Sequence, residues 1–244
     1  MLPRPVALLL DFGGVLADAP PQRPAPPELV LRLYNLTRGA LTPGEIQRSL
    51  TDGHAGYARW RDLDLPDELP QAEVWERFVI RHWPRTAQAA VRSSVSKLTY
   101  DWAWRSGWAL RPGIPELLHA AAGSGIPMAV VSNTIKGAAH RDFLGKAGVG
   151  RLFAAQIYSD EAGVRKPNPQ MIWHAAGELG VPAEGCWFVG DSRQRDIVCA
   201  RRAEVAVAVL MRSARTDRED PDAWPEPDAT ISDGYGLVKL VLGK

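Results

Sequence analysis

The sequence is poor in cysteine, nearly balanced in charge and without a long apolar run. Its only two cysteines, Cys186 and Cys199, lack the spacing of metal ligands, and we therefore expect a reduced, cytoplasmic protein. The formal net charge is +1 over 244 residues, which argues against nucleic-acid and membrane-surface partners. No apolar segment reaches the roughly 20 residues that cross a bilayer. The chain is long enough for one or two domains with a sizeable core.

Five short apolar segments predict the strands of one sheet. They are residues 6–11, 127–133, 154–159, 186–191 and 205–211. Their apolar residues are continuous rather than alternating, as in parallel strands buried on both faces. Segments of helical length separate the last four strands. The clearest covers 168–180, where Asn168 can cap the helix and Gly180 ends it. The alternation of strands and helices predicts an α/β fold with right-handed crossovers.

A long insert follows the first strand, although a plain crossover needs only ~10–12 residues. It begins with a proline-rich stretch at 19–28 that should be extended. It is then mostly helical, with helices predicted over 28–38, 43–51, 70–83 and 86–106. We predict a helical cap domain over 19–108, inserted into a core domain of residues 1–18 and 109–244. A surface loop is expected over 215–228.

Polar side chains follow the predicted strands, where ligands bind in open α/β sheets. The first strand ends at Asp11, and the second ends at Ser132 and Asn133. Lys166 follows the third strand, and the fourth is followed by Asp191 and Asp196. Each segment is common by itself, but their order and their shared position at strand ends together favour a functional site.

These residue types suit phosphoryl chemistry. Three converging carboxylates, Asp11, Asp191 and Asp196, would repel one another without a cation, and oxygen ligands favour Mg²⁺. Lys166 supplies a second positive charge, while Ser132 and following amide groups would donate to phosphoryl oxygens. Asp11 would then attack phosphorus in line and form an aspartyl-phosphate. The glycines after Asp11 would let the backbone approach the metal and phosphate closely.

The motifs "DFGGVLAD", "VVSNT", "RKPNP" and "GDSRQRD", in this order, resemble the haloacid dehalogenase superfamily, whose members are mostly phosphatases. The resemblance implies a Rossmann-like parallel sheet with helices on both faces and an inserted all-helical cap. It also implies roles for the residues of these motifs. Asp11 would be the nucleophile and a metal ligand, and the other metal ligands would be the Gly13 carbonyl, Asp191 and Asp196. The phosphate-binding groups would be Ser132, Asn133 and Lys166, of which Ser132 and Lys166 would also have catalytic roles. The expected activity is Mg²⁺-dependent hydrolysis of a small phosphorylated metabolite by a monomer or homodimer.

One position departs from the family pattern. Phosphatases of this family usually carry a second aspartate two residues after the nucleophile, which protonates the leaving group and later activates water. Here that position is Gly13. His54, expected on a loop of the cap, is a candidate replacement. A second anionic group of the substrate could meet cap arginines, for which the candidates are Arg59, Arg61, Arg81 and Arg105.

Two alternatives remain open. A metal-independent 2-haloacid dehalogenase also lacks the second aspartate, because halide leaves without a proton, but it would not need Asp191 and Asp196. A non-catalytic protein that binds a phosphorylated ligand would also explain Gly13. Six of the nine tryptophans lie in or beside the cap and are expected either in its core or around a substrate pocket; they are Trp60, Trp75, Trp83, Trp102, Trp104 and Trp108.

Overall fold

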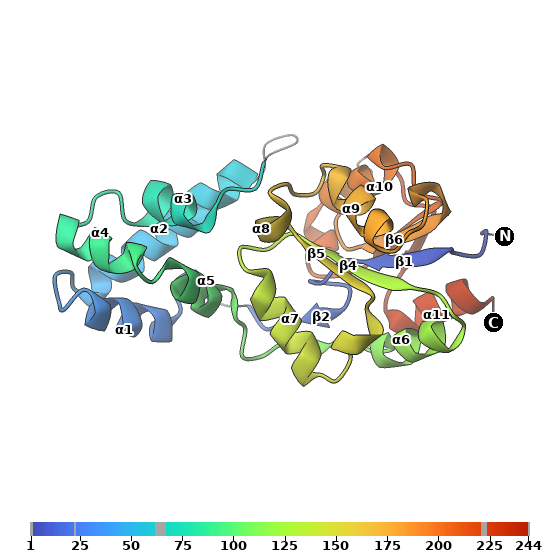
Figure 1. The fold of residues 1–244 in the computed structure, drawn as a ribbon, viewed down its shortest axis with the longest axis horizontal. Helices are drawn as coiled ribbons and strands as arrows, with labels where there is room; N and C mark the ends of the chain where they lie inside the picture. The colour runs from blue at the N-terminus through green and yellow to red at the C-terminus, as the bar shows by residue number, and fades with distance from the viewer. Residues whose placement is uncertain (1, 22, 62–66, 221–223, 244) are drawn as a thin grey trace.

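A six-stranded, wholly parallel sheet forms the centre of the part of the molecule that holds both termini in the computed structural model, which describes residues 2–21, 23–61, 67–220 and 224–243 (Figure 1). The strand order is β5-β4-β1-β6-β7-β8. The bounds are β1 Ala7–Leu10, β4 Met128–Ser132, β5 Ala155–Tyr158, β6 Cys186–Gly190, β7 Val207–Met211 and β8 Ala229–Ile231. The five predicted strands and the α/β class are confirmed. The short edge strand β8 was not predicted.

The register brings the polar strand ends together. Leu10 of β1 lies opposite Val130 of β4 and Val189 of β6. All three strands run in the same direction, so the residues that follow Leu10, Ser132 and Gly190 meet at one edge of the sheet.

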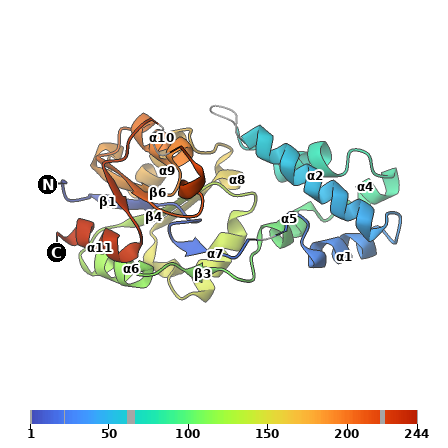
Figure 2. The same cartoon turned by 180° about the vertical axis from the view of Figure 1, so that it is seen from behind.

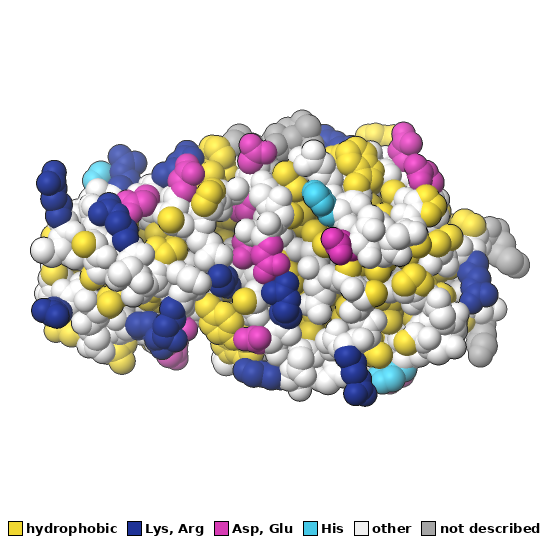
Figure 3. Space-filling view, in the orientation of Figure 1, with side chains coloured by type: hydrophobic (Ala, Val, Ile, Leu, Met, Phe, Trp, Pro, Cys, Tyr) yellow, Lys and Arg dark blue, Asp and Glu magenta, His cyan; other side chains and the backbone are white. Residues whose placement is uncertain are grey.

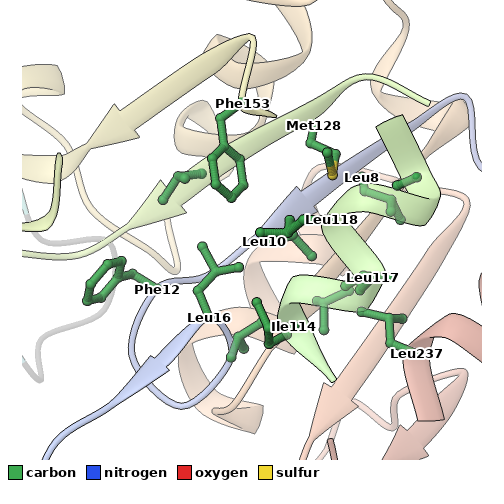
Figure 4. Close-up of a cluster of buried hydrophobic side chains, with 14 of the residues drawn as sticks. Leu8, Leu10, Phe12, Leu16, Ile114, Leu117, Leu118, Met128, Phe153 and Leu237 are labelled. Carbon is green, nitrogen blue, oxygen red and sulfur yellow. The ribbon is translucent and has the colours of Figure 1, made fainter. Parts of the chain in front are cut away.

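Three helices cover one face of the sheet. They are α6 (Ile114–Gly123), α7 (Gly137–Lys146) and α11 (Gly234–Leu242). Leu8 and Leu10 of β1 point to this face, where Ile114, Leu117 and Leu118 of α6 pack over them (Figure 4). All five side chains are at most 1% exposed. This cluster is the larger part of the core, which fixes β1 in the middle of the sheet.

Two helices cover the opposite face, namely α9 (Gln170–Glu178) and α10 (Val198–Arg202). Ala7 and Leu9 of β1 point to this side and join a cluster with Ile172 and Cys199. Because successive residues of a strand point to opposite faces, β1 is buried on both, as its continuous apolar run predicted. Short helical turns complete the core: α8 (Ser159–Ala162), η2 (Gly150–Leu152), η3 (Ala183–Gly185), η4 (Arg193–Ile197) and η5 (Thr216–Arg218).

A helical insert, residues 19–108, leaves the core between two paired short strands. β2 (Ala17–Asp18) and β3 (Ala109–Leu110) are antiparallel, so the two connections lie side by side. The insert occupies the end of the molecule away from both termini (Figures 1 and 2). Its helices are α1 (Pro27–Leu36), α2 (Pro43–Arg61), α3 (Gln71–Val74), η1 (Trp75–Val79), α4 (Arg85–Arg92) and α5 (Val95–Ala103).

The insert has an apolar cluster of its own. Leu33, Ile46, Leu50 and Val91 are fully buried in it, and so is Trp75. Two further tryptophans of the insert, Trp83 and Trp102, also belong to this cluster. These three tryptophans are therefore core residues of the insert.

Several predicted helix bounds were wrong. The helix expected over 43–51 continues to Arg61, and the one expected over 86–106 is broken at Ser93 and Ser94 into α4 and α5. The helix expected over 70–83 ends at Val79. In α2, a Cβ at Gly53 would lie 2.8 Å from the Phe78 carbonyl oxygen. The glycine thus permits close packing against η1, and this tertiary contact outweighs its low helix propensity.

A second contact joins the insert to the core through buried charges. Arg165 Nη1 lies 2.7 Å from Glu68 Oε2, and both side chains are at most 3% exposed. Ser159 Oγ lies 2.6 Å from the same carboxylate oxygen, and the Tyr57 hydroxyl bonds to Glu68 Oε1. The Glu68 amide also donates to the Gly163 carbonyl at 3.0 Å. The insert is therefore anchored beside Lys166 as well as at β2 and β3.

Charged side chains of both signs are interspersed on the face shown in Figure 3. Among the described residues, no helix combines the length and the apolar character needed to span a membrane.

Candidate active site

Three buried carboxylates meet at the carboxyl end of the sheet. Asp11 directly follows β1, Asp191 directly follows β6, and Asp196 lies in the helical turn η4. One oxygen from each lies within 4.8 Å of the others, and the three residues are at most 4% exposed. The sequence prediction that these acids converge is therefore correct in geometry.

Lys166 lies among these acids with its side chain only 2% exposed. Its Nζ is 2.8 Å from Asp11 Oδ1 and 2.7 Å from Asp196 Oδ1, and it donates to the Val131 carbonyl at 2.9 Å. Burial alone would lower the pKa of Lys166, but Asp11 and Asp196 outweigh it, so its pKa is raised. The lysine is therefore held as a fixed cation beside Asp11.

Asn133 holds the backbone of Lys166. Its Nδ2 donates to the Lys166 carbonyl at 2.9 Å, and its Oδ1 accepts from the Lys166 amide at 2.8 Å. The geometry gives Asn133 a positioning role, while phosphate binding by its side chain stays a prediction.

Ser132, the last residue of β4, has an aromatic partner that the sequence did not reveal. Its Oγ lies 3.5 Å from Nδ1 of His140, and the His140 ring stacks on Phe12 with 3.8 Å between ring centroids. Burial, with smaller effects from Arg105 and Lys166, lowers the pKa of His140 to about 3. The ring is therefore neutral near pH 7. The only sequence signal was its place in the helix that begins after the "SNT" motif.

The segment expected as a surface loop, 215–228, takes part in the site, although its residues 221–223 lie outside the described residues. Arg215 Nη1 is 3.1 Å from Asp191 Oδ1, and Thr216 Oγ1 donates to the Asp191 carbonyl at 2.5 Å. Just before this segment, Ser213 Oγ donates to Asp191 Oδ2 at 2.6 Å. The sequence did not indicate this contribution to the site, because these partners are distant in sequence and no local pattern marks them.

The acids differ in how they are held. Asp196 Oδ2 accepts the backbone amides of Asp191 and Ser192 at 3.0 Å each, which fixes its orientation. Burial raises the pKa of Asp191 to about 7, even though Arg215 opposes this. Burial likewise raises the pKa of Asp11, with Lys166 opposing it. The pKa directions show that removing these carboxylates from water is not fully offset by the cations beside them.

The donor set fits a magnesium ion. Three carboxylates face two cationic side chains, Lys166 and Arg215, so a fully ionised cluster carries excess negative charge. The available donors are oxygens, which Mg²⁺ prefers, and a divalent cation would favour the charged form of all three acids.

The two glycines after Asp11 have different structural roles. A Cβ at Gly13 would meet nothing within 4 Å, and its φ is not in the left-handed region. Gly14 has φ +79°, and a Cβ there would overlap the Asp191 carboxylate. Gly14 is therefore required by the close approach of β1 to Asp191. Gly13 leaves open space beside Asp11 where the family's usual second aspartate would be.

A pocket of about 270 Å³ opens in front of Asp11, Ser132 and Lys166. Residues of the insert form part of its wall. His54 and Tyr57 of α2 line it together with Arg61, the last residue of that helix, because residues three and seven positions apart share one helix face. Arg105 and the tryptophans Trp102 and Trp108 also line it. His54 is thus on a helix and not on a loop. Of the other candidate arginines, neither Arg59 nor Arg81 is among the described residues that line the pocket.

Residues 7–204 match the profile of the haloacid dehalogenase-like hydrolase family. The chain belongs to this family. It is 38% identical over 136 residues to a phosphoglycolate phosphatase from Pectobacterium atrosepticum, covering 54% of this chain and 57% of that protein. It is 31% identical over 122 residues to a phosphoserine phosphatase from Thermus thermophilus, covering 50% and 48%. The matches thus span about half the length of these relatives.

A crystal structure of a 2-haloacid dehalogenase from Pseudomonas syringae pv. tomato is similar over 100% of this chain and 99% of that chain, with a TM-score of 0.65. The identity is 18%, so this similarity concerns the fold and not the reaction. The resemblance stated from the four motifs is confirmed at the level of the family and the fold.

Proposed function

We propose that the protein is a Mg²⁺-dependent phosphohydrolase that acts on a small phosphorylated metabolite through an aspartyl-phosphate on Asp11. One observation carries the proposal. Asp11 is buried at the end of β1, faces the pocket, and lies 2.8 Å from Lys166 and within 4.8 Å of Asp191 and Asp196. The phosphatase names of the relatives support the same reaction class.

In the first step, a carboxylate oxygen of Asp11 forms a bond to phosphorus, and the bond from phosphorus to the leaving-group oxygen breaks. The leaving group takes the electron pair. Lys166 and Ser132 donate hydrogen bonds to the phosphoryl oxygens as charge develops on them. Lys166 favours the ionised form of Asp11 and so partly opposes burial, which raises the pKa of this carboxyl group.

The residues that would hold Mg²⁺ are Asp11, Asp191 and Asp196, with the Gly13 carbonyl as a fourth ligand. When bound, the ion neutralises charge between the acids and the phosphoryl group. Arg215 holds Asp191 from the other side, and the two backbone amides on Asp196 keep that acid oriented.

In the second step, water attacks phosphorus and the bond from phosphorus to the Asp11 oxygen breaks. Inorganic phosphate is released, and the Asp11 carboxylate is regenerated. Gly13 offers no acid or base for either step. His54 lines the pocket, and burial, with Arg61 and Arg105, lowers its pKa. A neutral His54 suits the acceptance of a proton from water better than protonation of a leaving group. We therefore expect substrates whose leaving groups depart without a proton.

We further propose that the insert is a cap domain, residues 19–108, on a core domain of residues 1–18 and 109–244. The paired strands β2 and β3, which bring the two connections side by side, support this division. The pocket wall formed by α2 supports a role of the insert in substrate selection.

The test is phosphate release from a panel of small phosphomonoesters, with Mg²⁺ and with a chelator, for the wild type and Asp11→Asn. We expect release that needs both Mg²⁺ and Asp11. Full activity in chelator, or activity retained by Asp11→Asn, would contradict the proposal. Chloride release from 2-chloropropionate without metal would establish the dehalogenase instead. Binding of phosphomonoesters with no release from any of them would indicate a non-catalytic protein.

A further inference from the structure

The pocket has more positive charge than the reaction centre uses. Among the described residues that line it, seven are Arg or Lys, against the two carboxylates of Asp11 and Asp196. Several of these cations already pair with acids, namely Lys166 with Asp11 and Asp196, Arg215 with Asp191, and Arg165 with Glu68. Of the rest, two half-buried arginines belong to the insert, namely Arg61 and Arg105.

Arg61 is poorly compensated within the described part of the chain. Its Nε is buried and has no hydrogen-bond partner among the described residues. Its guanidinium lies over the Tyr57 ring, 4.9 Å from the centroid, and both side chains line the pocket. Burial, together with the nearby Arg165 and Arg195, lowers its pKa to about 10. A buried guanidinium beside other cations is stabilised by an anion.

Arg105 is the second arginine of the insert at this pocket. It follows α5 and lines the same pocket. Burial lowers its pKa. Over residues 2–21, 23–61, 67–220 and 224–243, no carboxylate forms an ion pair with Arg61 or Arg105. The two arginines thus place positive charge on the insert wall, while Ser132 and Lys166 are on the core wall.

We propose that Arg61 and Arg105 bind a second anionic group of the substrate, a carboxylate or a phosphate, at the insert wall of the pocket. The inference rests on the proposed function, in which the phosphoryl group binds at Asp11, Ser132 and Lys166. The pocket volume of about 270 Å³ lies below the usual range for drug-sized ligands and suits a small molecule with two anionic ends. The arginines would select such a substrate because charge-assisted hydrogen bonds are stronger than neutral ones.

The test compares 4-carboxyphenyl phosphate with 4-carbamoylphenyl phosphate, which differ mainly in one negative charge. The bisphosphate of hydroquinone, 1,4-phenylene bisphosphate, distinguishes a second phosphate from a carboxylate. We expect kcat/KM for an anionic substrate to exceed that for the amide by ~10-fold or more, the size of one good charged hydrogen bond. Arg61→Gln and Arg105→Gln should each reduce this ratio by ~10-fold.

Arg59→Gln is the matched control, because Arg59 is on the same helix but does not belong to the described pocket wall. It should keep the wild-type ratio. Equal kcat/KM for the anionic and amide substrates in the wild type would overturn the inference without any variant. Titration of 4-carboxyphenyl phosphate and 4-carbamoylphenyl phosphate into Asp11→Asn measures the dissociation constant of each. The ratio of the two constants tests the subsite without turnover. An absence of phosphate release by the wild type would instead contradict the proposed function.

Discussion

Lys166 Nζ lies 2.8 Å from Asp11 Oδ1 and 2.7 Å from Asp196 Oδ1, so it bridges the two carboxylates. One buried ammonium therefore serves both the proposed nucleophile and a proposed metal ligand. Lys166→Gln should lower kcat/KM by at least ~10²-fold, because the phosphoryl group loses a fixed cation. The free energy of unfolding should also fall by about 3–5 kcal/mol, because two buried carboxylates lose their partner. Kinetics on an aryl phosphate and denaturant unfolding measure the two effects.

The control for this change is Lys239→Gln on α11, where the lysine is exposed. It should leave both quantities near their wild-type values. A Lys166→Gln protein that keeps wild-type kcat/KM would contradict the assignment of this lysine to the phosphoryl group.

Gly13 and Gly14 should respond in opposite ways to added side chains. A Cβ at Gly13 meets nothing within 4 Å, whereas a Cβ at Gly14 would overlap Asp191, and Gly14 has φ +79°. Gly14→Ala should therefore lower both stability and activity. Gly13→Asp should raise the rates for alkyl phosphates most, because a positioned acid contributes ~10²–10⁴-fold to rates that need protonation.

The measurement is log kcat/KM against the pKa of the leaving group for the wild type and Gly13→Asp. We expect a steep wild-type line and a flatter one for the variant. A flat wild-type line, with the chemical step shown to limit the rate, would mean that another acid acts, and His54→Ala would then test whether that acid is His54.

The neutral, buried His140 should make stability depend on pH. Its pKa is about 3 in the folded protein, against 6.5 ordinarily. Between these values the unfolded chain binds a proton that the folded protein does not. The free energy of unfolding should therefore fall by about 1.4 kcal/mol per pH unit on acidification through this window from this residue alone.

His140→Gln should remove this contribution, so that the difference in unfolding free energy between wild type and variant changes with pH by that slope. Urea unfolding from pH 6.5 to pH 4.5 measures it. The matched control for loss of a histidine is His82→Gln at an exposed position. A difference between wild type and His140→Gln that does not vary with pH would refute the prediction.

The buried pair of Glu68 and Arg165 should dominate the anchoring of the insert. Glu68→Gln leaves the Arg165 guanidinium without its carboxylate at 2.7 Å, so the free energy of unfolding should fall by about 3–5 kcal/mol. Glu73→Gln removes an exposed ion pair with Arg77 at 3.0 Å and should change the free energy of unfolding by less than about 0.5 kcal/mol. Similar losses in the two variants would show that the buried pair is not the main anchor.

The strand ends account for the part of the site that sequence could predict. Asp11 and Asp191 directly follow apolar strands, and parallel topology brings such residues to one edge, while Lys166 lies beyond β5 and α8 and was placed by its motif. Asp196 follows Asp191 by five positions and was placed by the same motif. The class of fold and the acidic cluster with its lysine could therefore be predicted from local sequence.

Partners that are distant in sequence could not be predicted in the same way. Arg215 reaches Asp191 from a polar segment that looks like a surface loop, and His140 is buried by stacking on Phe12. The end of α2 was misjudged at Gly53, where packing against Phe78 overrides local propensity and carries His54 and Arg61 into the pocket wall. β8 was missed because a three-residue edge strand has too few residues to show a pattern.

The stereochemical course at phosphorus tests the central claim most directly. An isotopically chiral aryl phosphorothioate, hydrolysed by the enzyme in isotopically labelled water, yields chiral thiophosphate whose configuration can be determined. Transfer to Asp11 followed by attack of water comprises two in-line displacements, each of which inverts phosphorus, so our account predicts net retention. Net inversion would mean a single direct attack by water and would contradict an aspartyl-phosphate intermediate.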